Sequence, residues 1–512
     1  MFKLFIVLTL HLFGKLEAAN SFKRRNIVLA TNFDSSNSLG KLLVSDILSK
    51  LPLDKYRVSL YSTNGVFQQF FDFQSRACLL KVLSNKQPKQ TSLTNALKQA
   101  MQEIEYSFND EKNFFVIVTD TYLDESSVEF LKSIRRSNLN EGIYILQIGK
   151  VIQTYFRKED GFNWISINST TIINNLPFIQ ANRQLCSKNY KLQLDECSRR
   201  CDCVDGKLVN CRRVRREFSS MSREERDLYL NTFKEFSVNP KYIEIYEKFV
   251  MSHQKYFWSG IHEAKQFYPW HRSYILKFES LLRVIDCRVT LPFWNWAYFS
   301  NSVWESTPTH HMWDIYGGFG GDGAKNMGYC VTEGIFNLNN WKTSKFEDRK
   351  NVILETCRIN QEESSESVKC IETASIPFLN KCLRRRFNGN VPNISSIIHV
   401  INNLLPNEFP SFERIVRNSW HNTIHKAIGG HMGTEYASYS PEFWSHHAML
   451  DGLWFEWQKK CAKCVYSGYP GKSEYLIGSK QNRHDYINSL KLGECGIKVV
   501  YDSIFVTKIS EQ

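Results

Sequence analysis

Histidines that fall into two groups are the chemically most informative residues of this chain. Of its 13 histidines, 11 lie between residues 253 and 447. Neutral imidazole is a good ligand for copper, and a site whose protein ligands are all nitrogen leaves each ion room to bind dioxygen. Three histidines in each group suit a coupled pair of copper ions. The candidate ligands are His253, His262 and His271 in the first group and His421, His425 and His447 in the second.

The spacing of the first group predicts two helices joined by a turn. Ile245, Phe249 and His253 are four residues apart, so they share one face of a helix. His271 begins a second apolar helical face, and His262 lies in the connection between the two helices. A core histidine without a metal is the alternative for His253.

The second group has the spacing of a helical metal site. His421 and His425 are four residues apart, so one helical face presents both rings to one ion. His447 lies on a further predicted helix, and Asp451, one turn later, is placed to accept a ring N–H and fix the tautomer of a ligand. A helix cap or a surface ion pair is the alternative for Asp451. We expect His446 to line the pocket.

The segments around both groups resemble a known family. Residues 249–296 contain His262-Glu263-Ala264, Pro269-Trp270-His271-Arg272 and Leu291-Pro292-Phe293-Trp294-Asn295-Trp296, and they are similar to the first copper motif of tyrosinases; residues 420–457 are similar to the second. The resemblance implies a mainly α-helical type 3 copper domain over residues 217–464, a four-helix bundle. It also implies that each histidine group holds one of two copper ions, that O2 is the co-substrate, and that phenolic small molecules or tyrosine side chains are the substrates.

The resemblance also implies a reaction and its assisting residues. Tyrosinases hydroxylate a monophenol to a catechol and oxidise the catechol to an o-quinone; an asparagine and an upstream glutamate orient a water that acts as base. Asn422 occupies the asparagine position, and Glu413 is the nearest upstream carboxylate. The residues around Glu413 do not reproduce the family's leucine-glutamate pair, so a surface residue is the alternative for Glu413. If Glu413 does not help to orient the water, catechol oxidation is favoured over phenol hydroxylation. Phe443 matches the aromatic residue that the family packs beside the metals.

Two departures from the family stand out. Many invertebrate and fungal relatives carry a cysteine two residues before the second ligand, joined to a histidine by a thioether, and Gly260 occupies that position here. Many also have a C-terminal domain that plugs the pocket, whereas only a tail over residues 465–512 follows the copper segment. We therefore expect any latency to arise elsewhere.

A different pattern precedes the copper segment. Over residues 22–171 short apolar runs alternate with amphipathic stretches, which predicts a doubly wound α/β domain. The expected strands are 26–31, 56–61, 114–119 and 143–148, and the expected helices are 39–51, 93–104 and 126–134.

Oxygen-bearing side chains follow the first and third predicted strands of this domain. A D-x-S-x-S pattern with a later threonine and aspartate resembles the metal-ion-dependent adhesion site of von Willebrand factor A domains, which implies Mg²⁺ or Mn²⁺ and an acidic partner, such as an extracellular matrix component. Thr94 is the alternative to Thr91 because the family's glycine-rich run is missing. The candidate ligands are Asp34, Ser36, Ser38, Thr91 and Asp120.

The N-terminus and the cysteines indicate export. Residues 1–19 have the layout of a signal peptide: a lysine, an apolar run over 4–13, and then small residues. No later apolar run reaches membrane-spanning length, so we expect a secreted, extracellular protein without a membrane span. A cysteine-rich bridge over residues 181–216 favours disulfides, with a zinc site as the alternative. Asn168 and Asn393 begin glycosylation sequons, so a glycoprotein is expected.

Charge discriminates less between functions. The net charge of +13 fits a basic surface or an acidic partner. The basic run 212–216 predicts a solvated helix start, with a processing site or a nucleic-acid patch as alternatives. Export and the lack of interleaved aromatic residues argue against nucleic acid.

Together these observations predict a secreted phenol oxidase for pigment formation or for tanning extracellular material. Its rivals are a catechol oxidase without monophenolase activity, an oxygen carrier resembling molluscan haemocyanin, and an adhesive protein whose copper domain is inactive. A carrier of that kind repeats its unit many times and lacks an A-type domain, whereas this chain has one copy.

Overall fold

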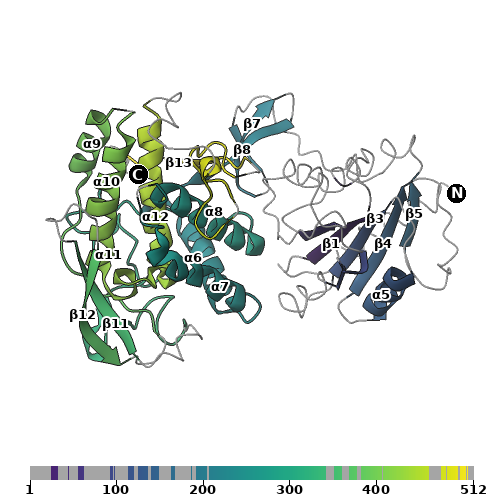
Figure 1. The fold of residues 1–512 in the computed structure, drawn as a ribbon, viewed down its shortest axis with the longest axis horizontal. Helices are drawn as coiled ribbons and strands as arrows, with labels where there is room; N and C mark the ends of the chain where they lie inside the picture. Colours follow the sequence, from purple (N-terminus) through teal and green to yellow (C-terminus); the bar gives the residue numbers. More distant parts are fainter. Residues whose placement is uncertain are drawn as a thin grey trace. The chain divides into compact units, whose positions relative to one another are not determined.

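The chain divides into two compact units, residues 1–211 and residues 212–512 (Figure 1). The computed structural model describes residues 25–32, 44, 56–62, 93–95, 97–98, 113–119, 125–136, 140–148, 163–167, 186, 192–195, 197–204, 207–263, 265–341, 351–359, 368–377, 382–405, 407–460, 474–479, 481–493, 496–502 and 504–505.

The first unit contains a five-stranded parallel sheet in the order β2-β1-β3-β4-β5. Its side chains are apolar on both faces, as parallel sheets require: Phe115, Ile117 and the adjacent Val118 are all fully buried. The four predicted strands, their parallel arrangement and the helix expected at 126–134 are confirmed, whereas β5 was not predicted. The helices expected at 39–51 and 93–104 lie mostly outside the described residues. The elements are β1 (Arg25–Asn32), β2 (Tyr56–Ser62), β3 (Asn113–Thr119), α5 (Glu125–Arg136), β4 (Asn140–Ile148) and β5 (Asn163–Ile167).

The predicted adhesion-type metal site of this unit lies outside the described residues. This applies to Asp34, Ser36, Ser38, Thr91 and Asp120. The alternative threonine, Thr94, is described: it is helical and buried, and its hydroxyl lies 2.9 Å from that of Ser126 and 2.8 Å from that of Ser127. Thr94 therefore contacts helix α5.

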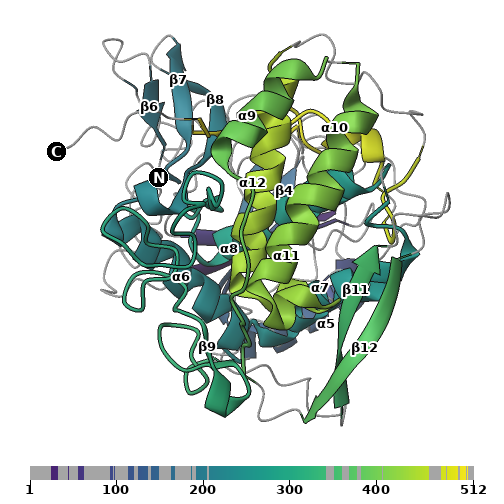
Figure 2. The ribbon, with the colours of Figure 1, turned by 90° about the vertical axis from the view of Figure 1, so that its left-hand side faces the viewer.

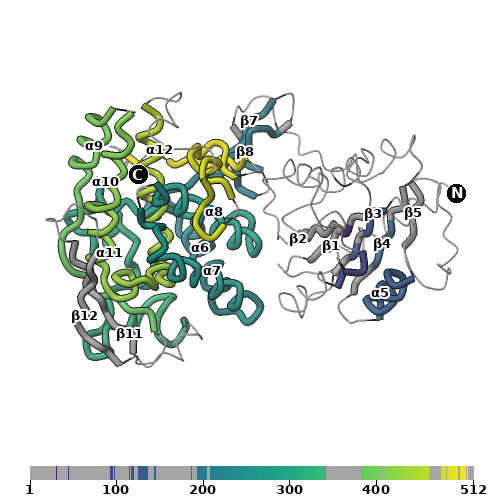
Figure 3. Tube along the Cα trace, viewed as in Figure 1, coloured from purple at the N-terminus to yellow at the C-terminus, as the bar shows by residue number. Residues whose placement is uncertain are grey.

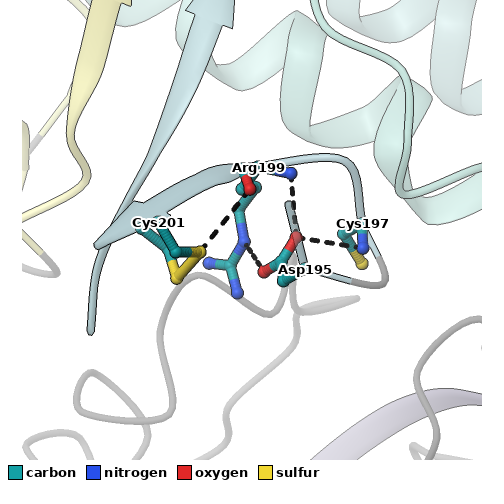
Figure 4. Close-up of a disulfide and its surroundings, with 5 residues drawn as sticks. Asp195, Cys197, Arg199 and Cys201 are labelled. Carbon is teal, nitrogen blue, oxygen red and sulfur yellow. Dashed lines mark hydrogen bonds and ion pairs between the residues drawn. A yellow bond between two sulfur atoms is a disulfide. The ribbon is translucent and has the colours of Figure 1, made fainter. Parts of the chain in front are cut away.

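The cysteine-rich segment contains β6 (Leu192–Leu194), β7 (Arg200–Val204) and the start of β8 (Lys207–Arg215). Two disulfides close it, Cys186–Cys203 and Cys201–Cys211, so the disulfide prediction is confirmed for these pairs. Asp195 organises the turn between β6 and β7 by accepting hydrogen bonds from the backbone N–H groups of Cys197 and Arg199 and from the Arg199 guanidinium (Figure 4). Cys201 and Cys211 lie near Asp195 in a metal-like cluster, but their disulfide removes both as thiolate ligands.

Helices dominate the described part of the second unit, and their path can be followed along the Cα trace in Figure 3. Helix α10, a π-helix and α11 follow one another without a break and run beside α12 (Figure 2). The helices are α6 (Arg223–Val238), α7 (Ile243–Tyr256), α8 (Phe267–Ile285), α9 (Ile394–Asn403), α10 (Phe409–Ile415), the π-helix η8 (Val416–His421), α11 (Asn422–Ile428) and α12 (Pro441–Gln458). Short 3-10 segments are η4 (Phe218–Ser220), η5 (Phe257–Ser259), η6 (Lys325–Met327), η9 (Gly430–Gly433), η10 (Ala437–Tyr439) and η12 (Arg483–Tyr486).

Helix α12 forms the centre of this unit. It is buried all round apart from Glu456, as a helix inside a large core must be. Helix α8 packs against it, and the rings of Phe278 and Trp444 stack with their centroids 3.6 Å apart. Phe233 of α6 packs edge-on against Phe278 at 5.1 Å, so an aromatic layer joins three helices.

The basic run 212–216 is not a solvated helix start, so that prediction is wrong. It ends strand β8, where Arg213 and Arg215 are fully buried. Both arginines bind Glu279 of α8, and the buried ion pairs explain why these charges tolerate burial. Strand β13 (Val499–Tyr501) pairs in parallel with residues 213–215, which brings the described end of the C-terminal segment into the second unit.

Two antiparallel pairs interrupt the helical pattern. They are β9 (Gly323–Ala324) with β10 (Cys330–Val331), and β11 (Asn351–Ile359) with β12 (Val368–Pro377). The second pair lies in an insertion that the disulfide Cys330–Cys382 brackets. In the described ranges, no helix combines the length and the apolar character needed to cross a membrane.

Candidate metal centre

The first histidine group comes from three consecutive pieces of chain. His253 lies in the last turn of α7, His262 in the turn after η5, and His271 in the second turn of α8. Gly260 opens this turn with a φ of 99°, a conformation that favours glycine, and it has no side chain for a thioether. The ring centroids lie 5.3 Å (His253 to His262), 5.7 Å (His253 to His271) and 5.1 Å (His262 to His271) apart. The predicted helix–turn–helix arrangement is confirmed.

The second group converges from three helical elements, of which two are continuous with each other. His421 ends the π-helix and His425 lies in α11, so the four-residue spacing places their ring centroids 4.3 Å apart. His447 of α12 completes the group, with its Nε2 atom 3.4 Å from the Nε2 atom of His425. Two ring nitrogens that face each other in this way can bind one cation together.

The two groups adjoin each other. The rings of His271 and His447 are stacked, with centroids 4.5 Å apart and planes at 6°. His262 and His421 face each other across the same boundary at 5.6 Å. The six predicted ligands therefore form a single cluster from five helical elements and one turn.

Hydrogen bonds to the outer ring nitrogens fix the direction of the inner ones. The Nδ1 atoms of His253, His271 and His425 lie 3.2, 2.7 and 2.7 Å from the backbone carbonyls of Glu435, Phe267 and Met432. Each of these Nδ1 atoms must donate, which leaves a lone pair on Nε2. His421 uses a side chain instead, because its Nδ1 lies 2.8 Å from Oδ1 of Asn422.

The inner nitrogens are suited to a metal. The Nε2 atoms of His253, His271 and His421 and the Nδ1 atom of His262 are buried without a hydrogen-bond partner among the described residues. Buried polar atoms normally have partners, and one metal ion in each group would satisfy these nitrogens. The donor set fits two copper ions, with the first group around one and the second around the other.

Burial keeps these rings neutral, as metal binding requires. Desolvation lowers the pKa of His253 to about 3 and that of His425 to about 4. Desolvation and the neighbouring histidines hold the pKa of the other four well below the usual range; these are His262, His271, His421 and His447. No proton therefore competes for the inner lone pairs at neutral pH.

Phe443 and His446 line the cluster. The centroid of the Phe443 ring lies 4.2 Å from that of His447 and 5.1 Å from that of His253, so Phe443 packs against predicted ligands of both groups. His446 is fully buried within ligand distance of the second group, and neither of its ring nitrogens has a described hydrogen-bond partner. Of the two adjacent histidines, His447 stacks on the first group, whereas the His446 ring contacts Trp296.

The predicted role of Asp451 as a hydrogen-bond acceptor for a ligand ring is wrong. Its carboxylate binds the guanidinium groups of Arg272 and Arg215 and the hydroxyl of Tyr501, and these donors occupy both oxygens. Asp451 acts on the cluster through the backbone instead, since Arg272 directly follows His271. This ion pair ties α8, which carries His271, to α12, which carries His447.

Asn422 and Glu413 have different surroundings. Asn422 lies at the cluster, where its side-chain oxygen accepts a hydrogen bond from His421. Glu413 is fully buried in α10, and its Oε1 binds Arg417 at 2.7 Å. The surface alternative for Glu413 is therefore wrong. The π-helix separates Glu413 from His421, and π-helical turns are common at functional sites.

Three contacts that shape the cluster leave no signal in motif spacing: the two backbone carbonyls that bind His253 and His425, and the ion pair of Arg272 with Asp451. The carbonyls of Glu435 and Met432 are backbone groups, which leave no signal in residue type. Arg272 could have been suspected, because a charged residue inside an apolar helical face requires a buried partner.

An all-histidine cluster with two adjoining groups has the donor set that a binuclear copper site requires. Residues 243–460 match the family model described as the common central domain of tyrosinase. The chain is 24% identical over 263 residues to the tyrosinase of Streptomyces glaucescens, and the aligned segment covers 48% of this chain and 83% of that protein. It is 28% identical over 229 residues to the tyrosinase-like protein phomQ2 of Diaporthe leptostromiformis, covering 42% and 49% respectively. Over residues 243–460 the chain is therefore similar to tyrosinases.

Proposed function

We propose that this protein is a secreted phenol oxidase that hydroxylates monophenols to catechols and oxidises catechols to o-quinones. The observation that carries the proposal is the convergence of six neutral histidines into two adjoining groups with inward lone pairs. Two copper ions held there would supply the binding and activation of dioxygen. The products would serve pigment formation or the tanning of extracellular material.

The residues of the chain supply placement and a dry environment. The Phe443 ring contacts ligands of both groups and so excludes water between them. The side-chain oxygen of Asn422 accepts a hydrogen bond from His421, so the amide N–H groups of Asn422 can orient a water or the phenol oxygen. A water held in this way would accept the phenol proton.

Catechol oxidation without hydroxylation is the second candidate, and one contact favours it. One oxygen of Glu413 already accepts a hydrogen bond from Arg417, so this carboxylate is less available to help Asn422 hold a water. A catechol oxidation site has less need of that base, because catechols lose their protons more readily than monophenols.

The decisive experiment compares tyramine with 4-tert-butylcatechol on the purified full chain loaded with copper. We expect two copper ions per chain and turnover of both phenols. Turnover of the catechol alone would select the second candidate. Copper binding with reversible oxygenation and no turnover would establish an oxygen carrier, and failure to convert either phenol would refute the enzymatic proposal.

Export and adhesion form a separate part of the proposal. Support comes from the disulfides in the described residues and from Asn393, an exposed sequon residue whose Oδ1 caps α9 and leaves its nitrogen for a glycan. The first unit would dock the enzyme to an extracellular partner through Mg²⁺ or Mn²⁺ at Asp34. Secretion with a glycosidase-sensitive mass, and matrix binding that the Asp34→Ala variant loses, would test both points.

A further inference from the structure

Glu435 makes three contacts with the segment that carries the first copper ligand. It lies between η9 and η10, in the connection that joins two helices of the second histidine group. Its backbone carbonyl lies 3.2 Å from Nδ1 of His253. Its carboxylate accepts hydrogen bonds from the side chains of Gln254, at 3.1 Å, and Trp258, at 3.0 Å.

We propose that Glu435 is a positioning residue that sets the first metal site from the half of the domain that carries the second. The proposal rests on the proposed copper function. The carbonyl selects the tautomer of His253, and the carboxylate holds the residues on either side of that histidine. The three contacts act together, because one residue provides all of them.

We call the three contacts of Glu435 the clamp. The segment that carries His253 and His262 needs it because the local structure of this segment is irregular. Helix α7 ends at Tyr256, a 3-10 turn follows, and Gly260 then adopts a positive φ. Trp258 is 59% exposed, so burial alone does not fix its ring, whereas its hydrogen bond to Glu435 restrains it. Trp258 packs on Phe257 with centroids 4.9 Å apart, and Phe257 lies 4.7 Å from the ring of His262.

The clamp therefore reaches two ligands by separate routes. Its carbonyl contacts His253 directly, whereas its carboxylate acts on His262 through Trp258 and Phe257. His271 has its own local partner, the carbonyl of Phe267. Loss of the clamp should weaken the first site and leave the second intact, because the partners of His421 and His425 are Asn422 and Met432.

The chemistry of the clamp predicts which substitution it tolerates. Both donors are neutral, and none of the ion pairs between described residues includes Glu435. Its charge is therefore dispensable. Glutamine at this position can accept from Trp258 with its oxygen and donate to the Gln254 carbonyl after that amide turns over. Alanine can do neither.

The test measures copper retention by the full chain during dialysis against a graded series of chelator concentrations. We expect the Glu435→Ala variant to lose one of its two copper ions about 10–100-fold more readily than wild type, the usual effect of removing a group that orients a ligand. The half-loaded protein should give the electron paramagnetic resonance signal of an isolated cupric ion. Glu435→Gln should retain both ions, and Trp258→Phe, which loses one hydrogen bond, should fall between.

The matched control is Glu244→Ala, which removes an exposed carboxylate from the first turn of α7, the helix that carries His253, and this variant should behave like wild type. Thermal unfolding of the copper-free variants separates the clamp from a folding defect, since Glu435→Ala should unfold near the wild-type temperature. Equal copper retention by Glu435→Ala and wild type would overturn the inference, as would equal loss in the alanine and glutamine variants. A wild-type protein that holds copper but oxidises no phenol would refute the proposed function alone.

Discussion

The two histidine groups are held in contrasting ways. The first comes from the end of α7, a turn and the start of α8, and the partner of His253 lies 182 residues away in sequence. The second places His421 and His425 on one unbroken helical run, with partners one and seven residues away. The second group is thus organised largely by its own segment, whereas the first needs a distant part of the chain.

This difference has a consequence for assembly. Local contacts form once a helix forms, whereas a contact across 182 residues exists only in the folded domain. We therefore expect the first site to respond to remote substitutions and the second to respond mainly to changes in its own helices.

The largest effect should come from removing a ligand on either side. His253→Ala and His425→Ala should each leave one copper ion per chain and abolish phenol oxidation, because the chemistry requires the pair. Copper analysis and a catechol assay measure both effects. His399→Ala, which alters an exposed histidine outside both groups, should keep two ions and full activity. An alanine variant that still held two ions would remove its histidine from the ligand set.

The same contrast explains what could be predicted from sequence. The spacing of His421 and His425 is a local signal, and the structure places both rings together as the spacing predicts. His253 had no comparable signal of its own, and only the motif around His262 and His271 singled it out. Periodicity correctly predicted α7, α8 and α12, and in the first unit it correctly predicted α5 and four of the strands.

The failures of prediction share a physical cause. Asp451 has the right spacing to reach His447, but Arg272, Arg215 and Tyr501 come from distant segments and take its oxygens. The arginines of β8 looked solvated because their carboxylate partners lie on other elements. Hydrogen-bond partners supplied by tertiary structure are invisible to a local pattern, and ionic residues gave the least reliable predictions for that reason.

The next largest effect should come from Asp451, whose ion pair with Arg272 ties α12 to α8. Asp451→Ala leaves the buried guanidinium groups of Arg272 and Arg215 without this carboxylate, so we expect the second unit to lose about 3–5 kcal/mol of stability. Denaturant unfolding followed by tryptophan fluorescence reports this unit, since 11 of the 12 tryptophans lie in it. Asp227→Ala, which breaks an exposed ion pair with Arg223, should cost less than about 1 kcal/mol. Equal costs would refute the buried network.

A smaller, one-sided effect should follow from Asn422. Its oxygen selects the tautomer of His421, so Asn422→Ala should weaken copper retention at the second site by about 10–100-fold and leave the first unchanged. Asn422→Asp keeps an acceptor and should retain the ion. Thr423→Ala, on the next residue of the same helix, is the matched control. If Asn422→Ala released copper from both sites equally, the two groups would not be organised separately.

The smallest effect should be a decrease in the stability of the copper-free protein as the pH falls, and histidines of both groups should contribute to it. The folded-state pKa is about 3 for His253 and about 4 for His425, both below the usual 6.5. The unfolded chain therefore binds more protons below pH 6.5, and stability falls as the pH decreases through this range toward pH 4. Each ring should contribute about 1 kcal/mol of loss between pH 7 and 5.5. His253→Gln and His425→Gln should each reduce the measured loss by that amount in urea unfolding at the two pH values. A loss that only one substitution reduced would mean that burial keeps only that group neutral, and the contrast between the groups would then extend to their electrostatics.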